Sequence, residues 1–175
     1  MDINLLVNIT ARAWSLKILA LLHEGVPGRQ APLLAATGAG RSAFAASLDH
    51  LAGLGLLERN PGHGHPLRPE FRLTAQGLAV APYASAILSQ LDGEEDFALI
   101  RKSWTVPVLA LITRPRHFTE IRTGLGAITD RALSQSLGLL EDHQWLSRNF
   151  DYEARRPRPL YQAINRGQAI SQVFV

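Results

Sequence analysis

Two stretches of the chain place apolar residues at helical spacing. In residues 14–22 and again in residues 104–112, apolar side chains occupy positions i, i+4, i+7 and i+8. The positions are Trp14, Ile18, Leu21 and Leu22 in the first stretch, and Trp104, Val108, Leu111 and Ile112 in the second. This spacing predicts two amphipathic helices, each with an apolar face packed against a core.

The second stretch lies 90 residues after the first, and two further blocks repeat in the same order. These blocks are residues 47–51 with 136–140, at an offset of 89, and residues 69–77 with 159–167, at an offset of 90. Three blocks in one order predict a duplicated domain. We place the boundary near Gly93, which gives a first domain over residues 1–92 and a second over residues 93–175.

Each copy continues with two more helices. A short apolar segment that ends in a glycine-rich turn predicts the second helix. The third helix follows with large apolar residues at helical spacing, and Thr129 is placed to cap its amino end in the second copy. The second helices are expected over residues 30–36 and 118–123, and the buried faces of the third helices are Phe44, Leu48 and Leu51 or Leu133, Leu137 and Leu140.

A β-hairpin with a polar tip is predicted after each third helix. The strands are expected over residues 56–60 and 71–74 in the first copy, and over residues 145–150 and 160–164 in the second. Two short helices followed by a hairpin that projects beside the second of them form a helix-turn-helix with a wing. The pattern therefore predicts an α+β fold, mainly helical, with two tandem winged helix-turn-helix domains.

The segment between the copies carries an acidic run. Residues 76–91 continue the first copy as a helix, and four carboxylates follow. They are Asp92, Glu94, Glu95 and Asp96. Because acidic side chains favour the amino end of the helix dipole, this run is expected to open the first helix of the second copy.

The composition indicates a globular protein with basic character. Apolar types make up 46% of the 175 residues, and the absence of cysteine excludes disulfides and cysteine-ligated metal sites. No apolar run reaches about 18 residues, and residues 1–10 have no cationic cluster, so we expect no membrane contact and a cytoplasmic, nucleoid-associated location. The net charge is +3, and Lys17 and Lys102 are the only lysines. Arginine supplies the other cations, and its planar guanidinium can donate two parallel hydrogen bonds to phosphate or guanine.

Residues 104–167 contain several blocks that together resemble a known family. The blocks are Trp104-Thr-Val-Pro-Val-Leu, His117-Phe-Thr-Glu-Ile-Arg122, Ile128-Thr-Asp-Arg-Ala-Leu-Ser-Gln-Ser-Leu137, Leu140-Glu141 and Arg158-Pro-Leu-Tyr161 before Gly167. In this combination the segment resembles the HxlR-type winged helices, a branch of the MarR-like regulators. The first copy lacks the Phe-Thr-Glu segment and resembles a diverged winged helix. The resemblance implies a DNA-binding repressor, usually a homodimer with one domain per chain, so two domains in one chain suggest either a monomeric pseudo-dimer or a homodimer.

In this architecture the third helix lies in the major groove and the wing follows the backbone or enters the minor groove. If the apolar face of the second copy's third helix is buried, its open face carries Arg131, Ser134, Gln135 and Ser136. The Arg131 guanidinium can donate two hydrogen bonds to guanine, and the Gln135 amide can form hydrogen bonds with adenine. Phosphate contacts are expected from the wing residues Arg155, Arg156 and Arg158 and from Thr129, Arg116 and His117. In a second interpretation the wing arginines form only a solvated loop.

The first copy is less well equipped to read bases. Its third helix presents alanines, with Arg41, Ser42, Ser47 and His50 as its hydrogen-bonding residues. We expect base contacts from Arg41 and Ser42 at most, and phosphate contacts from Arg29, Arg68, His63 and His65. The two halves of a DNA site would then be read unequally. An alternative is that the first copy has become a protein-interaction or dimerisation module.

Enzyme chemistry finds little support in the sequence. Residues 38–43 match a dinucleotide-binding pattern but lack the preceding strand that such a site needs, and no P-loop or nucleophile elbow is present. His63 and His65 could begin a metal site, but no third ligand is evident, and the surrounding glycines and prolines favour a turn. We therefore expect no cofactor, no metal and no enzymatic activity.

The sequence thus favours a sequence-specific regulator that binds double-stranded DNA and acts as a repressor. The alternative is a winged-helix module that binds a protein partner and touches DNA weakly or not at all. No residue pattern points to a small-molecule effector. Apolar residues near both ends could form a dimerisation surface or cap the cores. They are Leu5, Leu6, Val7 and Ile9, with Val173, Phe174 and Val175 at the other end.

Overall fold

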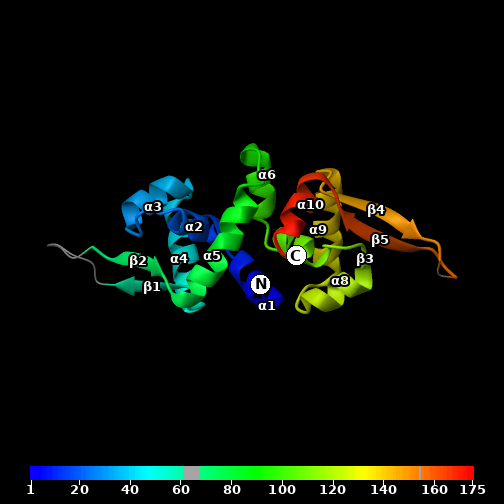
Figure 1. The fold of residues 1–175 in the computed structure, drawn as a ribbon, viewed down its shortest axis with the longest axis horizontal. Helices are drawn as coiled ribbons and strands as arrows, with labels where there is room; N and C mark the ends of the chain where they lie inside the picture. The colour runs from blue at the N-terminus through cyan, green and yellow to red at the C-terminus, as the bar shows by residue number, and fades with distance from the viewer. Residues whose placement is uncertain (61–67, 154) are drawn as a thin grey trace. The chain divides into compact units, whose positions relative to one another are not determined.

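The structure is a computed structural model that describes residues 1–60, 68–153 and 155–175 (Figure 1). These residues form ten helices, a two-stranded sheet and a three-stranded sheet, so the fold is α+β and mainly helical. The chain divides into two compact units. The first unit is residues 8–89, and the second is residues 90–175 together with residues 1–7.

Four helices of the described chain lie within the first unit. They are α2 (Ser15–His23), α3 (Gln30–Thr37), α4 (Arg41–Gly53) and α5 (Ala75–Leu88), while α1 (Ile3–Thr10) runs across the division between the units. The apolar spacing predicted for residues 14–22 is confirmed in part, since Ile18 and Leu21 are buried while Trp14 and Leu22 remain half-buried. Helix α3 ends at Thr37 and is followed by Gly38, whose φ of 75° is favourable for glycine. This turn sets the angle between α3 and α4.

A hairpin follows α4 in the first unit. Its strands are β1 (Leu57–Asn60) and β2 (Glu70–Leu73), paired antiparallel with Leu57 opposite Leu73. Arg29, just before α3, adds an isolated bridge to Glu70. The hairpin is thereby joined to the amino end of α3.

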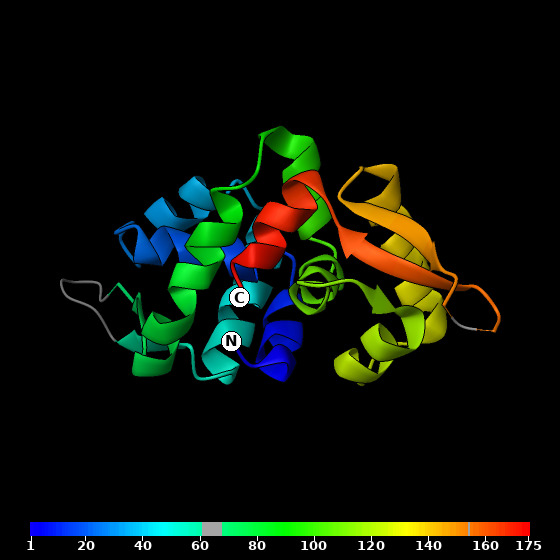
Figure 2. The ribbon, with the colours of Figure 1, turned by 45° about the vertical axis from the view of Figure 1, so that its right-hand side comes forward.

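The second unit has the same order of elements, with an additional helix at its start and the additional short strand β3. Its elements are α6 (Gly93–Ile100), α7 (Thr105–Leu111), β3 (Arg116–His117), α8 (Phe118–Leu125), α9 (Asp130–Asp142), β4 (Leu146–Asp151), β5 (Arg158–Ala163) and α10 (Asn165–Gln172). The strand order in the sheet is β3-β5-β4, with both pairings antiparallel. The core includes Val108, Leu109, Leu137 and Leu140. Figures 1 and 2 show the β4–β5 hairpin projecting beyond the helices of its own unit.

The acidic run differs in part from its prediction. Glu94, Glu95 and Asp96 do lie in the first turn of a helix, but this is α6, which ends at Ile100. The helix predicted from the Trp104 pattern begins separately as α7. Asp96 is buried and forms an ion pair with Arg166 of α10, so the acidic run also fastens α6 to the end of the unit.

Membrane-spanning potential is limited in the described part of the chain. No single helix there has both the length and the apolar character needed to cross a bilayer. Helices α1 and α2 reach this length only together, and the chain bends by 105° at the break between them.

Candidate nucleic-acid interface

Helix α9 presents a polar face at its amino end because its apolar residues are turned inward. Leu133, Leu137 and Leu140 are all buried, as their spacing predicted. The Thr129 hydroxyl accepts a hydrogen bond from the backbone N–H of Ala132 at 3.2 Å, which confirms the predicted cap. The helix is therefore held on one side and capped at the end that would approach a ligand.

The residues predicted to read bases lie on this open side of α9. Arg131, Ser134 and Gln135 are exposed, and Ser136 is half-buried. Because 3.6 residues make one helical turn, Arg131, Ser134 and Gln135 share one face of the helix. That face offers a guanidinium, a hydroxyl and an amide within one turn and a half, a set able to pair with base edges.

The turn between α8 and α9 is fixed by Arg122. Its Nε donates to Asp130 Oδ1 at 2.9 Å, and its Nη1 donates to the Gly126 carbonyl oxygen at 2.9 Å. Ile121 and Ile128 are buried beneath this turn. No role for Arg122 follows from the sequence alone, because its partners are defined only once α8 and α9 are packed.

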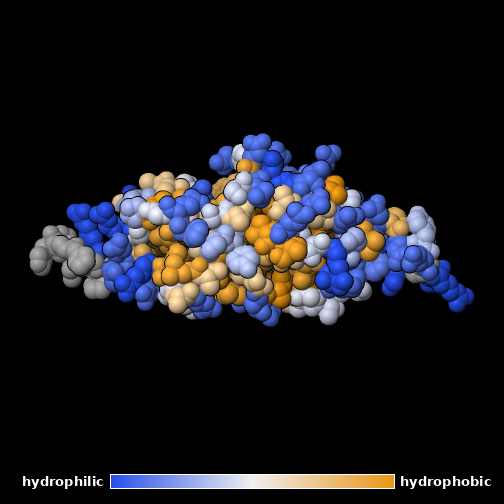
Figure 3. Space-filling model, in the orientation of Figure 1, coloured by the Kyte–Doolittle hydropathy of each residue, from blue (hydrophilic) through white to orange (hydrophobic). Residues whose placement is uncertain are grey.

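The hairpin beside α9 carries exposed cations. Arg155, Arg156 and Arg158 are all exposed, and Arg148 on β4 is exposed as well. Figure 3 shows mainly hydrophilic residues over this hairpin. The guanidinium groups are thus placed where they could contact phosphates.

Arg116 and His117 are held by their own unit. The Arg116 Nε donates to the Leu111 carbonyl oxygen at 2.6 Å. The two ring nitrogens of His117 lie 2.9 Å from the Pro159 carbonyl oxygen and 3.3 Å from an Asp151 carboxylate oxygen. Both side chains are mostly covered: Arg116 joins β3 to the end of α7, and His117 joins it to the hairpin.

A capping box closes the amino end of α8. The backbone N–H of His117 donates to Glu120 Oε2 at 2.7 Å, which satisfies one of the free N–H groups at this end of the helix. This hydrogen bond lowers the pKa of the Glu120 carboxyl below its ordinary value of 4.5, and the positive charges of nearby side chains add to the effect.

The corresponding helix of the first unit is poorer in polar groups. Arg41 and Ser42 are exposed in the first turn of α4, as expected. Ser47 was expected on the open face but is 1% exposed, because its position in the helix turns it to the core beside Leu48. The ring of His50 is engaged with the Asn8 carbonyl oxygen at 2.6 Å. Only the amino end of α4 therefore offers free polar groups of the predicted set.

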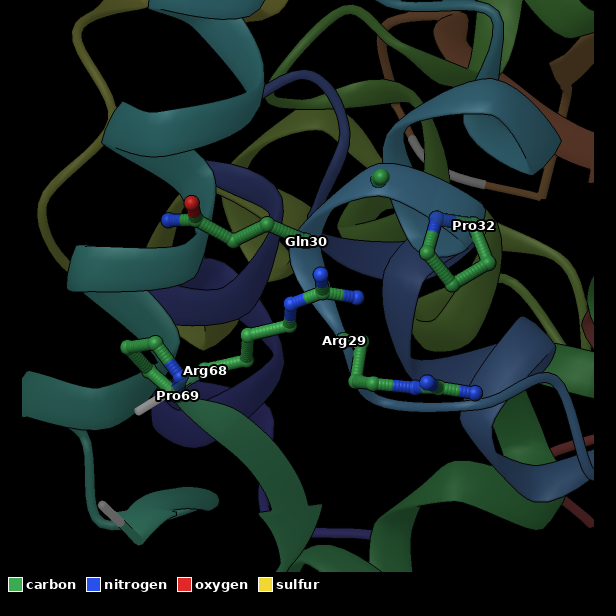
Figure 4. A pocket seen from close by; sticks show the side chains of 6 residues that line it. Arg29, Gln30, Pro32, Arg68 and Pro69 are labelled. Atoms are coloured by element: carbon green, nitrogen blue, oxygen red, sulfur yellow. The ribbon is translucent and has the colours of Figure 1, made fainter. Parts of the chain in front are cut away.

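Arg29 and Arg68 line one open pocket of about 550 Å³ at the start of α3, together with Gln30, Pro32 and Pro69. Figure 4 shows the Arg68 side chain crossing toward the backbone of Arg29 and Gln30. Both arginines are exposed, so they could contact an anion such as a phosphate. The structure thus brings together two residues that are 39 positions apart in the sequence.

His63 and His65 lie outside the described residues, so their expected phosphate contacts stay predictions. Among the residues that the structure does describe, no group of three or more histidine, aspartate or glutamate side chains is arranged to hold a metal ion.

Helices α8 and α9 with the following hairpin have the order of a helix-turn-helix with a wing, the class of fold in which the second helix enters the DNA major groove. Comparison with known families agrees with this assignment. Residues 99–175 match the model of the HxlR-like helix-turn-helix family. The resemblance noted for residues 104–167 is therefore confirmed. Searches of curated proteins and of solved structures found no match.

Proposed function

We propose that this chain is a sequence-specific regulator of transcription that binds double-stranded DNA through two winged-helix domains. The observation that carries the proposal is the open face of α9, with Arg131 and Gln135, in a segment that matches the HxlR-like helix-turn-helix family. This face stands next in the chain to a hairpin rich in exposed arginine. Base-reading and phosphate-binding groups thus occur in the two elements that a winged helix uses.

Equivalent backbone contacts support two copies of one domain. In the first unit the Leu56 N–H donates to the Leu51 carbonyl oxygen at 3.0 Å, and the Thr74 N–H donates to the Leu56 carbonyl oxygen at 3.0 Å. In the second unit the Trp145 N–H donates to the Leu140 carbonyl oxygen at 2.9 Å, and the Ile164 N–H donates to the Trp145 carbonyl oxygen at 3.0 Å. Leu56 and Trp145 are 89 positions apart, which is the offset found in the sequence.

The second domain would supply most of the sequence selectivity. In α9, Arg131 would donate two hydrogen bonds to guanine, and Gln135 would pair with adenine. In α4 the matching surface is formed largely by Ala43, Ala45 and Ala46, all exposed. The first domain would therefore position the protein through Arg29, Arg41 and Arg68, and the two halves of the DNA site would be unequal.

The regulatory effect would be repression. A protein that occupies a duplex site obstructs polymerase, and this direction of control is carried over from the family that the second unit resembles. With two domains in one chain, either a monomeric pseudo-dimer or a homodimer would supply the two half-site contacts.

The exposed alanines of α4 favour a second candidate for the first unit. A helix face of small apolar side chains can pack closely against another protein helix, so the first unit would act as a protein-interaction or dimerisation module. In that case the DNA site would shrink to the half read by α9.

Charge reversal in the second unit tests the DNA interface that both candidates share. Arg131→Glu and Arg155→Glu should each weaken binding to a duplex selected from a random library by about tenfold or more, because each places a carboxylate near a phosphate or base edge. Lys102→Glu is the matched control, since Lys102 is exposed in the turn between α6 and α7, outside the helix-turn-helix. Equal affinities for all four proteins, measured by fluorescence anisotropy, would overturn the DNA interface.

A further inference from the structure

The wing of the second unit exposes two aromatic side chains. Phe150 is 46% exposed and Tyr152 is 76% exposed. In the described part of the chain, the other large apolar side chains with comparable exposure are Met1, Leu78 and Val175, none of them aromatic. Rings with this exposure contribute little to the core of their own unit and are available to a partner.

The two rings belong to one ordered edge with Arg148. Side chains alternate along a strand, so Phe150 and Arg148 share a face of β4 with Leu146, which is buried. The Arg148 guanidinium lies 5.6 Å from the centre of the Phe150 ring, and the rings of Phe150 and Tyr152 are 6.3 Å apart and tilted by 45°. We call Arg148, Phe150 and Tyr152 the aromatic edge. The aromatic edge lies on the same side of the sheet as buried Leu146, but farther along the hairpin, where the side chains are exposed to solvent.

The charges around the aromatic edge fit a polyanion. The hairpin carries the exposed cations Arg155, Arg156 and Arg158 in addition to Arg148. Its two carboxylates are those of Asp151 and Glu153, so the four arginines outnumber them. Asp151 is mostly covered, accepts a hydrogen bond from the Glu153 N–H and lies beside the His117 ring. Rings set among guanidinium groups are poorly suited to a neutral apolar partner and well suited to a nucleic acid.

We propose that the aromatic edge enters the minor groove of the bound duplex and wedges a base step open. Phe150 and Tyr152 would pack against sugars and partly unstack one step, while the arginines bind the flanking phosphates. This inference rests on the proposed function and adds a second source of specificity to it. Steps that unstack easily, such as TA and CA/TG, would be favoured at a position that α9 does not read.

The wedge would act on one side of the DNA site only. In the first unit Arg59 of β1 corresponds to Arg148, but the sequence from residue 58 to residue 70 contains no phenylalanine, tyrosine or tryptophan. The bend should therefore lie off centre, within the half-site that α9 reads.

The test uses the full chain and a duplex of about 25 base pairs recovered from a random library. End-labelled donor and acceptor dyes report bending, and 2-aminopurine placed at successive steps reports unstacking. The wild type should bend the duplex by about 20° or more and brighten 2-aminopurine at one step. Phe150→Ala with Tyr152→Ala should abolish both signals and weaken binding on the order of tenfold. Tyr152→Phe, and the exposed apolar control Leu78→Ala in the first unit, should keep them.

Each contrary result has its own meaning. Duplex binding by the wild type without bending or unstacking would overturn the wedge and leave the proposed function standing. Bending that persists in the double variant would also overturn the wedge. A wild type that prefers single-stranded DNA to the duplex would overturn the wedge too, if the double variant loses that preference. Absence of any duplex binding would overturn the proposed function and the wedge together.

Discussion

Gly167 lies so close to Trp145 that a Cβ atom on the glycine would be 2.0 Å from the Trp145 carbonyl oxygen. The same relationship exists in the first unit, where a Cβ on Gly77 would be 2.0 Å from the Leu56 carbonyl oxygen. In both places the first turn of the closing helix crosses the start of the hairpin at backbone contact. These glycines thus fix the base of each hairpin relative to the helix that follows it.

A side chain at this crossing should destabilise the second unit. Gly167→Ala should lower the free energy of unfolding by about 1–3 kcal/mol, because the backbone must move to admit the methyl group. Gly138→Ala is the control within the same unit. A Cβ there meets nothing within 4 Å in the middle of α9, so this change should raise stability by up to about 1 kcal/mol. Chemical denaturation would contradict the close crossing if both variants changed stability in the same direction.

The cap of α9 should matter for stability. Thr129→Ala removes the hydrogen bond to the Ala132 N–H and should cost about 1 kcal/mol. Thr129→Ser keeps the hydroxyl and should retain most of the stability. Thermal melts of the three proteins provide the measurement, and equal melting temperatures for Thr129→Ala and the wild type would show that the cap contributes nothing.

Acid should remove the contribution of Glu120 to the capping box. Since the pKa of Glu120 is lowered in the folded chain, folding favours its charged form, and the resulting stability is present above the ordinary value of 4.5 and lost as the pH falls through the folded value. Glu120→Gln should therefore be less stable than the wild type near pH 7. The difference should shrink as the pH is lowered toward about 3. A difference that is independent of pH would contradict this account.

The sequence predicted the features that depend on residues close together in the chain. Leu133, Leu137 and Leu140 are buried as their spacing predicted, and Thr129 caps α9 as its position before the helix predicted. Helix α8 begins at Phe118, as expected, although it ends at Leu125 rather than near Thr123. Helical periodicity and capping depend on residues a few positions apart, so a single sequence is enough to predict them.

Features that depend on distant partners were not predicted. The short strand β3 forms because Arg116 and His117 meet β5 more than 40 residues later, and two residues leave no strand pattern in the sequence. The same pairing explains why His117 is mostly covered. The exposure of Phe150 and Tyr152 was missed as well, because an aromatic residue on a strand is usually interpreted as core.

Mutation of an arginine that reads bases should change DNA binding differently from mutation of an arginine that binds phosphate. Arg131→Ala should weaken binding to the selected duplex by about 1–3 kcal/mol and relax the choice of base at one position. Arg155→Ala should weaken binding to all duplexes alike and reduce the slope of log K against log salt by about one. Repeating the library selection with each variant checks the distinction. A uniform loss for Arg131→Ala, or a base-specific loss for Arg155→Ala, would reverse these assignments.

Fluorescence anisotropy of the purified chain with a labelled duplex from a random library, titrated with salt, tests the DNA-binding proposal most directly. We expect tight binding at low salt and a linear fall of log K with log salt, with a slope that corresponds to roughly four or more neutralised phosphates. Absence of binding even at low salt would contradict it and favour a winged-helix module that binds a protein partner.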